Sequence, residues 1–283
     1  MNNALSISGL TKTYKDFVLD GVSFSVPSGS IVGLIGENGA GKSTTINAVL
    51  GLIQKEAGNI TVLGKEQLDN KTKEQVGVVF DGSNYPEILS PKRLNRVLKN
   101  IYHSWDEHTF LGFLKKLSLP IDKPIKQYSR GMKMKLAISA ALSHNSKLLI
   151  LDEATSGLDP VIRDDILDIL LDFVQDEEHS ILISSHITTD LEKIADYIVF
   201  IHEGKVVFSK PKDELTEQYG IIKCGAVQFD ALDKSDIIVY RKMDYEWQVL
   251  IADRMAMQKK YPKAMIVPAT IDEIMLLYVK GEK

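Results

Sequence analysis

The segment Gly36–Thr44 contains the residues with the clearest chemical meaning in the chain. Its sequence, GENGAGKST, fits the pattern G-x-x-x-x-G-K-[ST]. Glycines let the backbone turn tightly, so that successive N–H groups can point at one phosphate group. Lys42 adds a mobile positive charge, and the Ser43 hydroxyl is suited to bind Mg²⁺. We therefore predict a phosphate-binding loop made of Gly36, Glu37, Asn38, Gly39, Ala40, Gly41, Lys42, Ser43 and Thr44.

The surroundings of this loop support the prediction. An apolar stretch, IVGLI, leads into it, and a helical pattern, TTINAVLGL, follows it. A helix at this place puts the positive end of its dipole beneath the phosphates. The alternative interpretation is a glycine-rich turn between a strand and a helix that carries a lysine by chance.

A second candidate segment is KLLILDE, residues 147–153. Its short apolar run is typical of a strand buried on both faces. At the exposed end of such a strand, Asp152 can orient Mg²⁺ and its water, and Glu153 can act as general base on an attacking water. Many strands end in a polar turn, so this pattern gains its weight from the phosphate-binding loop that precedes it.

Strand and helix patterns alternate along most of the chain. Residues 4–36 predict three strands, and 90–118 predict helices, with Leu94, Val97, Leu98 and Ile101 on one face. Further helices are expected over 129–142, from Pro160 and from Thr188. Strands are expected at GNITVLG, VGVVFD, HSILISS, YIVFI and KVVF. A β-α-β-α succession predicts a mostly parallel sheet covered by helices.

The character of the sequence changes near Pro211. We expect one domain over residues 1–210, with a helical subdomain at about 85–142, and a small C-terminal accessory region over 211–283. That region mixes a helical start (KDELTEQYG), β-rich segments (IIVYR, WQVLIA) and a final amphipathic helix (IDEIMLLYVK). The acidic row after Pro160 (Asp164, Asp165, Asp168, Asp172, Asp176) predicts the solvated face of an amphipathic helix.

Composition narrows the class of protein. A net charge of -4 argues mildly against a nucleic-acid partner, and none is expected. The single cysteine, Cys224, excludes an intrachain disulfide and fits a reducing cytosol. The N-terminus has no signal-peptide pattern, and the apolar runs are shorter than the roughly 18 to 20 residues that cross a bilayer. Any transport role therefore requires a membrane-spanning partner.

With these motifs in order, residues 5–208 closely resemble the ATP-binding cassette (ABC) family. The segment YSRGMKMKLAISAAL, residues 128–142, is similar to the family's signature segment. The resemblance implies that Ser129 and Gly131 contact the γ-phosphate of ATP held by a second subunit, at a helix start where such contact is sensible. In SGLDP, it implies that Asp159 contacts the opposite subunit. Asp159 followed by Pro160 is also a good helix start, and both roles can hold.

Two further residues match positions of the family. His186, after the strand ILISS, resembles the switch histidine that contacts the γ-phosphate and helps to position the water. Tyr14 matches the aromatic residue that stacks on adenine. A histidine after a strand is more often structural, and Tyr14 could instead be a core aromatic.

Two segments depart from the family's usual pattern. The strand VGVVFD ends in Asp81, where the family usually has a glutamine that touches Mg²⁺ and water. Asp81 could bind the metal, or it could leave that place to water. The signature segment has SRGMK in place of the commoner SGGQ, so that Arg130 and Met132 replace small or neutral residues. This spelling resembles bacterial exporter subunits for drugs, peptides or lipids.

The resemblance implies an α/β P-loop NTPase cassette. It has a mostly parallel central sheet, an N-terminal antiparallel β subdomain, a helical signature subdomain and a small α+β C-terminal appendage. It implies an ATP- and Mg²⁺-dependent ATP hydrolase that pairs with a second cassette and drives a separate transmembrane permease, for export, from the cytoplasmic face of the membrane. The alternatives are a soluble ABC ATPase and a nucleotide-dependent regulator not coupled to transport. The cargo is not determined by these residues.

Overall fold

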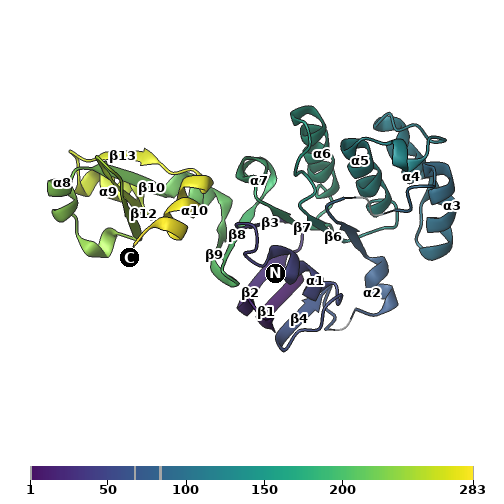
Figure 1. The fold of residues 1–283 in the computed structure, drawn as a ribbon, viewed down its shortest axis with the longest axis horizontal. Helices are drawn as coiled ribbons and strands as arrows, with labels where there is room; N and C mark the ends of the chain where they lie inside the picture. The colour runs from purple at the N-terminus through teal and green to yellow at the C-terminus, as the bar shows by residue number, and fades with distance from the viewer. Residues whose placement is uncertain (1, 67, 83–84, 283) are drawn as a thin grey trace.

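A mostly parallel six-stranded sheet forms the centre of the protein in a computed structural model that describes residues 2–66, 68–82 and 85–282. Five of its strands run parallel, and only β9 pairs antiparallel, with β8. Figure 1 shows this sheet between the other parts of an elongated molecule. In spatial order its strands are β5 (Val76–Val79), β6 (Leu148–Asp152), β7 (Ser180–Ser185), β3 (Ile31–Ile35), β8 (Tyr197–His202) and β9 (Lys205–Pro211).

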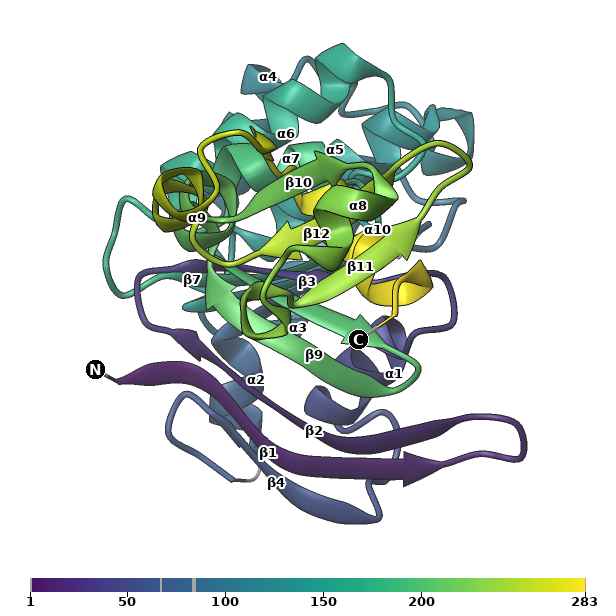
Figure 2. The ribbon, with the colours of Figure 1, turned by 90° about the vertical axis from the view of Figure 1, so that its left-hand side faces the viewer.

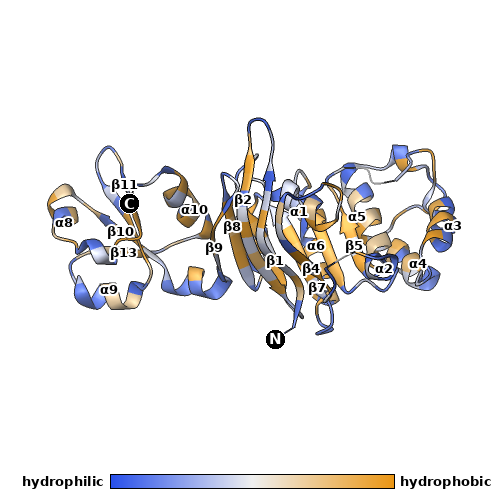
Figure 3. Cartoon of the chain, turned by 90° about the horizontal axis from the view of Figure 1, so that it is seen from below, coloured by the Kyte–Doolittle hydropathy of each residue, from blue (hydrophilic) through white to orange (hydrophobic). Residues whose placement is uncertain are grey.

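Both faces of the central sheet are buried, because successive side chains of a strand point to opposite faces. In β6, Leu149 and Leu151 pack on one side, and Leu148 and Ile150 pack on the other. The apolar colour of these inner strands is plain in Figure 3. The continuous apolar run that precedes Asp152 is therefore explained by burial on two faces.

One face of the sheet packs against an antiparallel sheet and one helix. The antiparallel sheet has the order β2 (Val18–Pro27), β1 (Asn3–Thr13) and β4 (Ala57–Val62), and the helix is α1 (Lys42–Val49). Figure 2 shows these strands on the side of the central sheet that is opposite to α5 and α6. The packing fixes the start of α1, which is the helix that leaves the phosphate-binding loop.

The opposite face is covered by α5 (Arg130–Ala141), α6 (Pro160–Phe173) and α7 (Thr188–Ile194). A helical subdomain extends from α5 and has its own apolar core, which includes Leu94, Phe110 and Leu136. Besides α5, its helices are α3 (Pro91–Ile101) and α4 (Glu107–Lys116); the short α2 (Asn70–Glu74) lies before β5.

The C-terminal residues form a four-stranded antiparallel sheet. Its spatial order is β11 (Val239–Lys242), β12 (Trp247–Ile251), β10 (Gly220–Cys224) and β13 (Met265–Pro268). The outer face packs against α8 (Ala226–Asp230) and α9 (Arg254–Lys260). The inner face contributes Ile221 and Leu250 to the main core, together with α10 (Ile271–Lys280). The N–H of Ile271 also donates to Glu192 of α7 at 3.1 Å. The C-terminal region is therefore joined to the cassette by a shared apolar core and by this hydrogen bond.

The predicted fold class and the predicted strands and helices are confirmed, and KDELTEQYG contains a π-helical turn over Glu214–Gln218. The sequence patterns did not single out α2, α8, α9, β10 and β13, which are all short. In the part of the chain that the structure describes, no helix is both long enough and apolar enough to span a bilayer.

A buried histidine connects the helical subdomain to the sheet. The His144 ring stacks on Tyr102 with 4.1 Å between ring centroids, and its Nδ1 lies 2.9 Å from the carbonyl oxygen of Glu74. Burial lowers the pKa of His144 below its ordinary value of 6.5. The folded protein therefore binds a proton at this site less readily than the unfolded chain does.

The pKa shift predicts a loss of stability in mild acid. Above the unfolded pKa both states hold a neutral imidazole, and as the pH falls below it only the unfolded chain gains the proton. We expect the melting temperature to fall between about pH 7 and about pH 5.5, and His144→Gln to flatten that dependence. Replacing the exposed His103 by Gln is the matched control. An unchanged slope in His144→Gln, measured by thermal unfolding, would contradict this assignment.

Candidate active site

The phosphate-binding loop connects β3 to α1, and two of its glycines are required by close contacts. A Cβ on Gly36 would lie 2.3 Å from the carbonyl oxygen of Ile201. Gly41 has a φ of 112°, and a Cβ there would lie 2.7 Å from Leu19. Only glycine accepts both the left-handed backbone and the lack of space. The loop is thus shaped by its contacts with β2 and β8.

Lys42 begins α1 and is buried, with only 5% of the residue exposed. Its Nζ donates to the carbonyl oxygens of Gly36 at 2.8 Å and Glu37 at 3.2 Å. The third partner is Glu153, whose Oε1 lies 3.3 Å away. An ammonium has three N–H donors, so each has a partner here, as burial of a charge requires.

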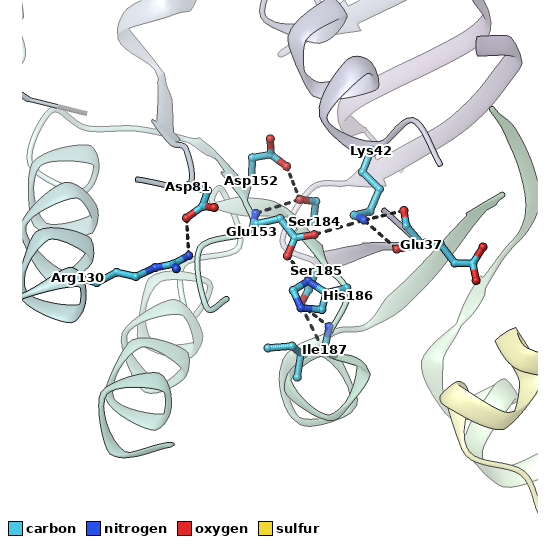
Figure 4. A network of polar contacts seen from close by, with 11 residues as sticks. Glu37, Lys42, Asp81, Arg130, Asp152, Glu153, Ser184, Ser185, His186 and Ile187 are labelled. Carbon is cyan, nitrogen blue, oxygen red and sulfur yellow. Dashed lines mark hydrogen bonds and ion pairs between the residues drawn. The ribbon is translucent and has the colours of Figure 1, made fainter. Parts of the chain in front are cut away.

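Glu153 lies between Lys42 and a histidine (Figure 4). Its Oε2 is 2.6 Å from Nδ1 of His186. Glu153 has a φ of 53°, in the left-handed region that side chains other than glycine rarely adopt. Its backbone N–H is held by the Ser184 hydroxyl at 3.1 Å. Strained backbone of this kind persists where surrounding contacts fix it, and it gathers at functional sites.

Asp152 ends β6 beside Glu153, and its position is fixed by the neighbouring strand. The Ser184 hydroxyl of β7 donates to Asp152 Oδ1 at 2.5 Å and also accepts from the N–H of Glu153. Ser184 therefore holds both acidic residues, and the sequence patterns did not identify it. The only sequence signal for it is a polar pair, Ser184 and Ser185, at the end of an apolar strand before His186.

A pocket of about 650 Å³ opens beside these groups. Tyr14 lines it with 44% of its surface exposed, so it is not a core aromatic. Phe17, which the sequence patterns missed, lines the same pocket. Gly36 and Ala40 of the loop are buried and do not line the pocket. The full lining is Tyr14, Asp16, Phe17, Glu37, Asn38, Gly39, Gly41, Lys42, Ser43, Thr44 and Glu153.

Ser129, Gly131 and Asp159 lie at the starts of helices and do not line this pocket. The Ser129 hydroxyl accepts from the N–H of Met132 at 3.2 Å and caps α5. Asp159 caps α6 by accepting from the N–H of Ile162 at 3.0 Å. A Cβ on Gly131 would lie 2.5 Å from Cδ1 of Ile162, so this glycine lets α5 and α6 approach closely.

Asp81, the last predicted metal ligand, is engaged by another side chain. Its Oδ1 lies 2.7 Å from Nη2 of Arg130, and both side chains are about half exposed. In Figure 4 the Asp81 carboxylate points toward Arg130. Two of the positions that depart from the expected pattern, Asp81 and Arg130, therefore contact each other.

A phosphate-binding loop between a central parallel strand and a helix, with acidic residues at the end of the strand β6, defines a P-loop nucleotide-binding protein. The ABC transporter family model matches residues 19–156. The chain is 38% identical over 212 residues to the lantibiotic transport ATP-binding protein SrtF of Streptococcus pyogenes, covering 74% of this chain and 91% of SrtF. It is 31% identical over 251 residues to the bacitracin transport ATP-binding protein BcrA of Bacillus licheniformis, covering 87% and 81% respectively.

A solved ATP-binding subunit of an ABC transporter superposes with a TM-score of 0.66 at 27% identity, over 75% of this chain and 91% of that one. The chain belongs to the ABC transporter family, as an ATP-binding subunit. The resemblance inferred from its motifs is confirmed. The alternatives of a soluble ABC ATPase or an uncoupled regulator are not favoured, because the relatives are ATP-binding subunits of transport systems.

The contact at Gly131 gives a prediction that separates packing from ligand binding. Gly131→Ala forces a methyl group toward Ile162, and such overpacking lowers the free energy of unfolding by about 1 to 3 kcal/mol. Adding Ile162→Ala makes room for that methyl group, so the double variant recovers stability in denaturant titrations. If Gly131 also contacts nucleotide in a second subunit, the double variant stays deficient in ATP hydrolysis although it is stable. Wild-type stability of Gly131→Ala would refute the packing role.

Proposed function

We propose that this chain binds and hydrolyses ATP in the pocket beside Lys42 and uses the reaction to drive a separate transmembrane permease, for export. The observation that carries the proposal is the contact of Glu153 with both Lys42 and His186 at the edge of that pocket. The names of the relatives SrtF and BcrA support a transport role.

Lys42 couples the binding of ATP to the release of Glu153 from its ion pair with Lys42. In the structure its ammonium is shared between loop carbonyls and Glu153. The β- and γ-phosphates of ATP carry more negative charge than one carboxylate, so they would replace Glu153 as the partner of Lys42. Glu153 Oε1 then becomes free to accept a hydrogen bond from the attacking water.

Glu153 is the proposed general base, and His186 the residue that holds it. A general base must lie within hydrogen-bonding reach of the proton that it accepts. The 2.6 Å contact with His186 fixes one carboxylate oxygen and leaves the other directed to the pocket. Hydrolysis then depends on positioning and charge stabilisation by Lys42 and the loop N–H groups.

Mg²⁺ fits the residues at this edge of the sheet. Ser43 lines the pocket, and Asp152 is oriented by its hydrogen bond from Ser184. Mg²⁺ commonly takes one or two protein oxygen ligands and completes its shell with phosphate oxygens and water. When bound, it would neutralise charge that develops on the phosphates. Asp81 is engaged by Arg130 instead, so Ser43 and Asp152 are the proposed ligands.

Two copies, or this chain and a related one, would form the complete sites. Ser129, Gly131 and Asp159 lie at the starts of α5 and α6, and not in the pocket of their own chain. We propose that they contact nucleotide held by the second subunit, while Tyr14 stacks on adenine within the same chain. The assembly would lie in the cytoplasm against the inner face of the membrane.

Glu153→Gln tests the catalytic assignment. The amide keeps the shape of the side chain but cannot accept a proton, so we expect ATP hydrolysis to fall by about 10²- to 10⁴-fold. ATP affinity, measured by calorimetry, should persist, and ATP should hold the variant as a dimer in size-exclusion chromatography. Lys42→Ala is the contrasting variant, since it should lose affinity itself. Turnover by Glu153→Gln at the wild-type rate would refute the proposal.

The permease contact is proposed to lie on the helical subdomain at residues 85–142. The most exposed apolar side chains described there are Ile88 at 76%, three residues before α3, and Ile101 at 59%, the last residue of α3.

Ile88→Asp combined with Ile101→Asp should remove a co-purifying multi-span membrane protein from detergent-solubilised membranes, because charges oppose an apolar contact. ATP hydrolysis by the isolated chain should be retained. The matched control is Met255→Asp on α9, which is 69% exposed and lies in the C-terminal region. Retention of the same membrane protein by the double variant would place the contact elsewhere.

A further inference from the structure

Arg130 joins three segments that surround the catalytic edge of the sheet. Its Nη2 contacts Asp81, which follows β5, at 2.7 Å. Its own backbone begins α5 directly after Ser129. Its guanidinium also lies against Gly157, in the loop between β6 and α6: a Cβ on Gly157 would be 2.7 Å from Nη1 and 3.0 Å from Cζ of Arg130.

Each of these segments is directly connected to a group of the proposed active site. The strand β5 pairs with β6, with Val79 opposite Leu151, one residue before Asp152. The loop that contains Gly157 starts at Glu153 and ends at Asp159, which caps α6. A displacement of Arg130 would therefore change the position of α5 relative to both ends of this loop, Glu153 and Asp159.

Charge gives a second reason for the arrangement. Asp81 adds a carboxylate to an edge that already holds Asp152 and Glu153, and this edge must receive the polyanion ATP. A third uncompensated negative charge there would oppose binding. Arg130 compensates the carboxylate of Asp81 and holds it in a fixed direction through a charge-assisted hydrogen bond.

We propose that Arg130 is a positioning residue for hydrolysis, which sets the place of α5 against the catalytic loop by binding Asp81 and packing on Gly157. The proposal rests on the ATPase function proposed above. Arg130 acts on the reaction through the segments that it joins, and Asp81 serves as its anchor. Asp81 is thus assigned to the contact with α5 and not to the metal.

The primary test compares steady-state ATP hydrolysis by the full chain in Arg130→Ala, Asp81→Asn and the charge-reversed pair Asp81→Arg/Arg130→Asp. We expect each single variant to lower kcat by about fivefold or more. The KM for ATP should change by less than about twofold in Asp81→Asn, because the cradle around Lys42 is untouched, and should rise in Arg130→Ala, where the carboxylate of Asp81 loses its counter-charge. The charge-reversed pair restores the ion pair but not the contact with Gly157, so it should recover part of kcat. A purely structural role would not produce that recovery together with an unchanged KM in Asp81→Asn.

Lys133→Ala is the matched control. Lys133 lies on the same helix and makes an ion pair of similar length, 2.6 Å, with Glu87, away from the catalytic loop. We expect its kcat to equal that of the wild type. Because the Asp81–Arg130 pair is half exposed, its loss should leave the melting temperature nearly unchanged, and thermal unfolding of every variant verifies that it is folded.

A second test uses the contact with Gly157. Gly157→Ala puts a methyl group where the guanidinium lies, so it should lower kcat in the wild-type background. It should lower kcat much less when Arg130→Ala is already present, because no guanidinium remains to be displaced. Backbone strain at Gly157, which has a φ of 65°, is the same in both backgrounds and would give additive effects instead.

The outcomes separate the two proposals. Wild-type kcat in both Arg130→Ala and Asp81→Asn, with normal hydrolysis by the wild type, overturns the role of Arg130 and leaves the ATPase function standing. Additive effects in the Gly157 test, or no recovery in the charge-reversed pair, also overturn it. Absence of ATP hydrolysis in the wild-type chain overturns the proposed function itself.

Discussion

The buried ammonium of Lys42 is the interaction on which the site depends. A charge with 5% exposure is tolerated only when its donors are satisfied, and here two loop carbonyls and Glu153 satisfy them. This requirement shapes the loop, because the carbonyls of Gly36 and Glu37 must turn inward. It also draws Glu153 across from β6. The site is therefore held together by the same charge that phosphate would bind, and in the proposed function ATP binding and the release of Glu153 from Lys42 are parts of one exchange.

The two-sided burial of the central sheet supplies the rigidity that this exchange requires. Loop, acids and histidine follow β3, β6 and β7, which are adjacent and parallel, so their carboxyl ends meet at one edge. Apolar residues on both faces leave these strands no freedom to slide. The C-terminal sheet adds to the same core through α10, and Glu192 of α7 ties it to the helix that follows His186. The C-terminal region thus packs directly against the cassette.

The helices around α6 are held partly by surface ion pairs, which are weaker than the apolar contacts of the central sheet. The acidic face of α6, which the sequence predicts as solvated, is exposed but also pairs with lysines from three other helices: Lys116–Asp172, Lys135–Asp165 and Lys193–Asp164. Exposed pairs of this kind contribute little to stability. Such contacts can be broken and remade at small cost, in contrast to the apolar core of the sheet, and they orient α4, α5 and α7 around α6. The Asp81–Arg130 pair is also half exposed, and the packing of Arg130 on Gly157 distinguishes it from these pairs.

The sequence by itself determined the elements and the chemistry of the loop, because strand and helix periodicities and the spacing of GENGAGKST are local properties. It also indicated Asp152, Glu153 and His186, each at the end of an apolar run. Only the tertiary structure decided what these groups contact. Ser184 holds Asp152 from 32 positions away, and Arg130 meets Asp81 across 49 positions. Short elements such as β10 and β13 were missed because too few residues repeat to show a period. Side-chain contacts between residues distant in sequence produce no regular spacing in the sequence, because they are fixed by how the sheet and helices pack.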